Sequence, residues 1–173
     1  IGQGALLHAL NVPRFFFHVF ATPLLFFLVY RLALGFGVPL AGHRSVVWIL
    51  WGLSAVLVGI GIVQELGSLE LVPKAELGTL RYTHPVPKPP LGPIAGNLIA
   101  IVAGVLIWRT AGWPVLFITS LFMLLTAGIP PKLFGQLPSN AGEIIFMSGF
   151  MLGLKRLAAD RINEADAEKS PAM

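Results

Sequence analysis

Three histidines and one glutamate are the residues with which this chain could do chemistry. His8 and His18 flank a Pro-Arg step in HALNVPRFFFH, Glu65 follows a long apolar run, and His84 lies in THPVPKPP. Imidazole nitrogens and a carboxylate oxygen suit zinc or iron, so His8, His18, Glu65 and His84 form one candidate set of metal ligands. The same groups could also transfer protons as general acids and bases.

The aromatic residues near His18 suggest a second kind of ligand. Phe17 beside His18, and Trp51 on a later segment, could pack on a tetrapyrrole whose central metal His18 ligates. A chlorophyll-type pigment or a haem is therefore the alternative to a divalent metal. Neither pattern is specific, because a metal-binding helix usually places its ligands three or four residues apart.

Simpler interpretations exist for two of these residues. An amphipathic ring such as that of His8 is favoured at a membrane interface without binding anything. Glu65 at the end of an apolar run can pair with Arg81 or Lys88 in the following loop. The chain also contains no Gly-rich phosphate loop, GxSxG elbow, HExxH motif or cysteine. A standard nucleophile or metal motif is thus excluded, and an enzyme is the less favoured class.

Composition indicates a membrane protein. The chain has 173 residues, of which 55% are hydrophobic and 12% are charged, and its mean hydropathy is +0.80. An ordinary soluble domain carries roughly 25% charged residues, and one of this length could not bury so much apolar surface. The net charge of +4 comes from basic residues at the ends of apolar segments, which suits lipid headgroups rather than nucleic acid.

The apolar runs predict an all-α, polytopic integral membrane bundle of five transmembrane helices in a single domain. A helix needs about 20 mostly apolar residues to cross the hydrocarbon core. The predicted spans cover residues 15–34, 46–63, 94–108, 115–129 and 143–157. The third and fourth runs are short, so four spans with a re-entrant hairpin are the alternative.

The connections differ in character. Residues 65–93 form a proline-rich loop in which YTHPVPKPP is expected to be extended. Residues 130–140 form a second loop, after which Asn140 and Glu143 have the spacing of a capping box for the last helix. Residues 155–170 are charged and are expected to emerge into water as the end of that helix.

Five spans place the two termini on opposite faces of the membrane. More basic residues fall on the face of the C-terminus, so the positive-inside rule predicts a cytoplasmic C-terminus. His8, His18, Glu65 and His84 then all fall on the opposite face. That shared location is what would allow them to meet.

We therefore expect an accessory or scaffolding subunit of a larger integral membrane complex. Its partners would be other integral membrane subunits and lipids, packed on aromatic faces and on small residues such as Gly52, Gly59 and Gly104. In an energy-transducing complex, photosynthetic or respiratory, pigment, haem or quinone would occupy the aromatic surface and serve electron transport. The alternative is a small membrane enzyme, metal-dependent or acid-base, that uses His18, Glu65 and His84.

Overall fold

The computed structural model describes residues 5–66, 72–76, 79–83 and 91–169. Five long helices make up most of this part of the chain: α1 (Ala5–Gly35), α2 (Arg44–Gly61), α3 (Leu91–Ala111), α4 (Val115–Ala127) and α6 (Leu137–Lys169). Three short helical segments join them: the 3₁₀ turn η1 (Pro39–Gly42), the π-helical turn η2 (Ile62–Leu66) and α5 (Pro131–Phe134). The predicted helical architecture is confirmed in this respect.

One feature inside the long predicted loop was not expected. Strand β1 (Val72–Glu76) pairs antiparallel with β2 (Thr79–Thr83), in a register that sets Val72 opposite Thr83. Strand β2 carries β-branched and aromatic residues, which favour pairing between extended strands. The prolines of this segment predicted a loop instead, because proline cannot donate a backbone hydrogen bond. The Pro-rich part that follows, residues 84–90, lies outside the described residues.

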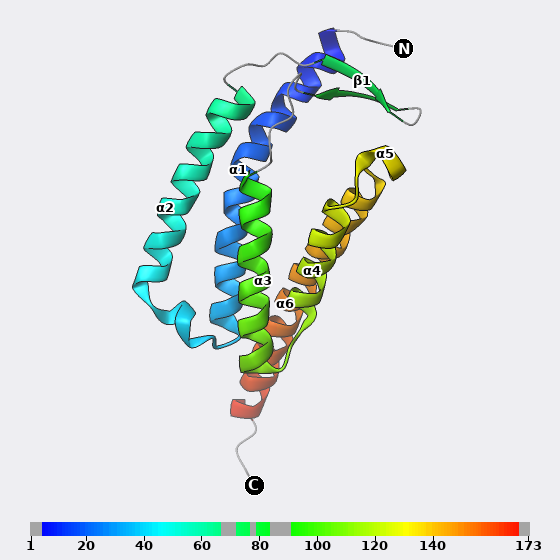
Figure 1. Cartoon of the computed structure of the whole chain (residues 1–173). Coiled ribbons are helices and arrows are strands. Elements are labelled where there is room, and N and C mark those ends of the chain that lie inside the picture. The colour runs from blue at the N-terminus through cyan, green and yellow to red at the C-terminus, as the bar shows by residue number, and fades with distance from the viewer. Residues whose placement is uncertain (1–4, 67–71, 77–78, 84–90, 170–173) are drawn as a thin grey trace.

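Helices α1, α3, α4 and α6 share one buried core, and α2 packs against α1 at its side. Helix α6 packs on α4 and on α1, α4 packs on α3, and α3 packs on α1, whereas α2 makes few contacts with α3. Figure 1 shows the β-hairpin at the same end as the start of α1, and the C-terminal end of α6 at the opposite end. The start of α1 and the end of α6 therefore lie at opposite ends, as expected when five successive helices alternate in direction.

Two helices of the described part are both long and apolar enough to cross a membrane. Residues Arg44–Gln64, which include α2, and Leu91–Ala111, which form α3, each contain 21 residues with hydropathies of 2.4 and 2.0. A helix of that length spans about 31 Å at 1.5 Å per residue. Within the described chain, only 11% and 33% of their apolar windows are buried.

Helices α3 and α4 form the tight hairpin that the sequence predicts. A Cβ atom added at Gly104 would stand 2.5 Å from the backbone nitrogen of Phe117, so the glycine allows the two backbones to touch. Asn97 lies buried on the same side. In the amide orientation that satisfies both groups, Asn97 donates to the Ser120 carbonyl at 3.1 Å and accepts from the Leu124 N–H at 3.2 Å.

Helix α6 packs on α4 through glycine and threonine. A Cβ at Gly142 would collide with Thr126, and one at Gly149 would collide with Thr119. The Thr119 hydroxyl donates to the Val115 carbonyl at 3.0 Å, a bond within its own helix turn. Such internal hydrogen bonds satisfy hydroxyl groups where no water is available.

One predicted boundary was wrong. The last helix begins at Leu137, so Asn140 lies inside it and does not cap it at Glu143. Pro138 falls in the first turn of α6, where the missing N–H of proline costs nothing. Helix α1 begins at Ala5 and accommodates both Pro13 and Pro23, so the predicted span of residues 15–34 lies within a longer helix.

Candidate functional site

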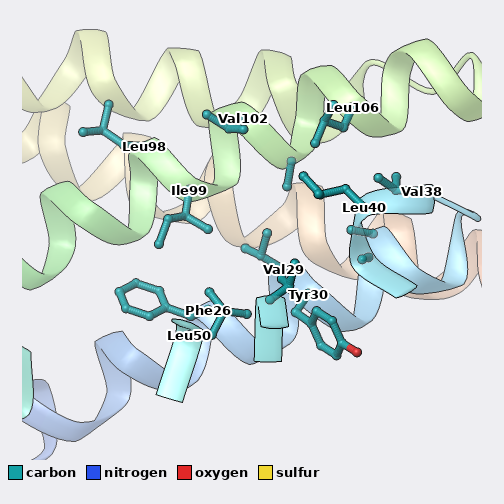
Figure 2. Close-up of a pocket in the computed structure, with 14 residues that line it drawn as sticks. Phe26, Val29, Tyr30, Val38, Leu40, Leu50, Leu98, Ile99, Val102 and Leu106 are labelled. Atoms are coloured by element: carbon teal, nitrogen blue, oxygen red, sulfur yellow. The ribbon is translucent and has the colours of Figure 1, made fainter. Parts of the chain in front are cut away.

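An apolar cavity with a volume of about 310 Å³ lies between α1, α2 and α3. Figure 2 shows Phe26, Val29 and Tyr30 of α1 on one side and Leu98, Ile99, Val102 and Leu106 of α3 on the other. Leu50 of α2 borders it as well. Its size falls at the lower end of the range for ligand pockets in proteins.

The cavity follows from the way α2 joins the other helices. Helix α2 packs on α1 but makes few contacts with α3, so a gap remains between α2 and α3. The turn η1 closes one end of this gap with Val38, Leu40 and Ala41. The Val38 N–H donates to the Ala33 carbonyl at 2.9 Å, which folds the turn back against the end of α1.

The residues that line the cavity can bind an apolar group but include no typical catalytic or metal-binding side chain. Every lining residue is apolar except Tyr30, whose hydroxyl points away from the α3 residues in Figure 2. Within this lining there is no imidazole, carboxylate or amine that could ligate a metal or move a proton. The lining therefore suits an apolar group, aliphatic or aromatic.

Phe17 and Trp51, two of the residues predicted to hold a tetrapyrrole, are not among the residues that line this cavity. Phe17 is 66% exposed on α1, and Trp51 is 57% exposed on α2 with its ring centre 4.7 Å from that of Phe27. The backbone of His18 lies next to Val19, which packs on Gly61 at the end of α2. The side chain of His18 is outside the described part, so its role as a ligand stays a prediction.

The predicted metal ligands are only partly placed. His8 and His18 lie on the N-terminal half of α1, and Glu65 lies in η2, which packs on α1. Their side chains, and all of His84, lie outside the described part of the chain. Among the described residues, no group of three or more histidine, aspartate or glutamate side chains could hold a metal ion. The set of His8, His18, Glu65 and His84 therefore remains a prediction.

Comparison with protein-family models, characterised proteins and solved structures finds no match to this chain. Two features of the described chain bear on its function: the apolar cavity between α1, α2 and α3, and the apolar helix surfaces that no described residue covers.

Sequence reasoning had no means of finding the cavity. Its lining residues are leucines, valines and phenylalanines of the same kind as those that face the surface of α2 and α3. Helices that are apolar on all sides give no periodic signal that separates an inner from an outer face. Only the spatial arrangement of α2 distinguishes them.

Proposed function

We propose that this chain is an integral membrane subunit that assembles with other membrane proteins, as an accessory or scaffolding component of a larger complex. The observation that carries the proposal is the outer face of α2. This face comprises Trp48, Gly52, Ala55 and Gly59, which recur at helical spacing and are all exposed. A soluble protein would not leave such a face in water.

The small residues on this face favour a helix as its partner. A Cβ atom added at Gly52 or Gly59 would meet nothing within 4 Å, so this chain leaves both glycines uncovered. Elsewhere in the chain, glycines such as Gly104 and Gly149 are used for close helix contact. Helices in membranes associate through small residues because these let backbones approach. A partner helix lying on Gly52 and Gly59 would repeat the contact that α3 makes with α4.

The membrane location rests on length, apolarity and exposure together. Helices α2 and α3 are long enough to cross, and large apolar side chains such as Ile49, Val63 and Leu125 are exposed. Basic side chains, including Arg44 and Arg109, lie at the end of the bundle where α6 becomes charged. That distribution supports a cytoplasmic C-terminus.

A bound apolar molecule belongs to the same proposal. The cavity between α1, α2 and α3 can take the apolar part of a lipid, a quinone or a pigment. A photosynthetic or respiratory complex is the setting in which the last two would occur, and the absorption spectrum of the purified complex would identify it.

Co-purification from the native membrane tests the subunit proposal. We expect wild-type protein, solubilised in mild detergent, to carry stoichiometric membrane partners. The Gly52→Leu/Gly59→Leu variant should lose them, because two leucines hold a partner helix away from α2. Its thermal unfolding temperature in detergent should equal or slightly exceed that of the wild type, since no described residue lies within 4 Å of a Cβ atom at either glycine and leucine favours a helix more than glycine does.

The matched control is Ala159→Leu/Ala165→Leu, which makes the same kind of enlargement at exposed positions on the charged end of α6. This variant should keep the partners. A wild-type protein that purifies alone, or a Gly52→Leu/Gly59→Leu variant that keeps all its partners, would contradict the proposal.

A further inference from the structure

A second depression lies between α1 and α6, and its lining differs from that of the apolar cavity. Arg31 and Leu34 of α1 border it on one side, and Leu154, Leu157 and Arg161 of α6 border it on the other. Its volume is about 520 Å³. It lies toward the end of the bundle where α6 turns from apolar to charged.

One close contact between α1 and α6 brings the arginines to this place. A Cβ atom at Gly35 would stand 2.5 Å from the Leu157 side chain, so α1 and α6 approach closely there. Arg31 precedes Gly35 by four residues, and Arg161 follows Leu157 by four. Residues four apart share one face of a helix, so both arginines flank the same contact.

The charged residues that line the depression are both basic. Both arginines are exposed, and no acidic residue of the described chain lines the depression. Asp160 is the nearest carboxylate in sequence, but it faces Arg156 at 3.9 Å. Two guanidinium groups therefore flank a wall of leucine side chains.

We propose that this depression binds an anionic phospholipid, with its phosphate held by Arg31 and Arg161 and an acyl chain along Leu34 and Leu154. The inference rests on the membrane location in the proposed function. Guanidinium groups bind phosphate through paired hydrogen bonds. Basic pockets between helices at the cytoplasmic side of a membrane are typical sites for anionic headgroups. A free phosphate ion could bind the two arginines, but it would leave the leucine side chains of the depression uncovered.

Native mass spectrometry of the purified chain, titrated with phosphatidylglycerol or with phosphatidylcholine of the same acyl length, tests this site. We expect the wild type to bind phosphatidylglycerol in preference. The Arg31→Gln/Arg161→Gln variant should bind it roughly thirty-fold more weakly, since each basic residue near a membrane surface contributes about one kcal/mol of attraction. The Arg31→Lys/Arg161→Lys variant keeps the charge but loses the paired hydrogen bonds, so its affinity should fall between those of the wild type and the glutamine variant.

The matched control removes the same charge elsewhere. Arg44→Gln/Arg109→Gln changes two exposed arginines that do not line the depression, and its phosphatidylglycerol binding should equal that of the wild type. Equal binding by all variants would overturn the proposal, as would displacement of the lipid by inorganic phosphate at comparable concentration. A protein that pellets with membranes yet shows no lipid preference contradicts this site alone, whereas a protein absent from membranes contradicts the proposed function.

Discussion

Replacing Gly104 with alanine is expected to lower the free energy of unfolding by about 3 kcal/mol, the upper end of the usual cost of overpacking. The added methyl group would stand 2.5 Å from the Phe117 nitrogen and 2.7 Å from its Cα atom. Backbone atoms cannot rotate away as a flexible side chain can, so α3 and α4 must separate. Separation would also weaken the bonds between Asn97 and the α4 backbone.

Unfolding in detergent by increasing SDS, followed by circular dichroism, measures this effect. Gly59→Ala is the matched control, because the same methyl group on α2 would meet nothing within 4 Å. It should leave stability unchanged or raise it slightly, since alanine favours a helix more than glycine does. Equal stability of the two variants would show that α3 and α4 are not in close contact at Gly104.

Replacing Val56 with arginine is expected to cost about 3 kcal/mol of membrane insertion, because a charged side chain near the centre of a spanning helix must leave water. Val56 is 59% exposed in the middle of α2. In a soluble protein the same change at an exposed position would have almost no effect. The size of the effect on insertion therefore shows whether lipid or water surrounds α2.

The fraction of protein that resists alkaline extraction from membranes reports this effect. Ile162→Arg is the control, because Ile162 is 61% exposed but lies on the charged part of α6. It should insert as the wild type does. Normal insertion of Val56→Arg, with full stability, would indicate that α2 faces water.

Helix α2 was predictable because an apolar run of about 20 residues has few other uses. The shorter run that contains Gly104 also became a helix, but α3 extends three residues beyond the predicted span at each end. The turn between Arg109 and Pro114 joins α3 to α4, and Gly112 in this turn has a φ of 66°. Boundaries were harder to predict. Pro13 and Pro138 look like helix breakers in a sequence, yet both lie within helices.

The sites were less predictable for a different reason. Histidines attract attention because their chemistry is visible in a sequence, whereas the lining of the apolar cavity, such as Val29 or Val102, resembles any other apolar residue. Arg31 and Arg161 border the same depression because Gly35 lets α6 approach α1. Gly35 lies 126 positions before Arg161 in the sequence. No local pattern encodes a contact between residues so far apart.

Single-cysteine labelling of α2 tests the central claim, that this helix crosses a membrane, most directly. The chain has no cysteine of its own, so His43→Cys, Val56→Cys and Gln64→Cys each introduce one site. In intact cells, a membrane-impermeant maleimide should label Gln64→Cys at once and His43→Cys only after permeabilisation, while Val56→Cys should react far more slowly than either. Labelling of both ends from the same side at equal rates would contradict the account.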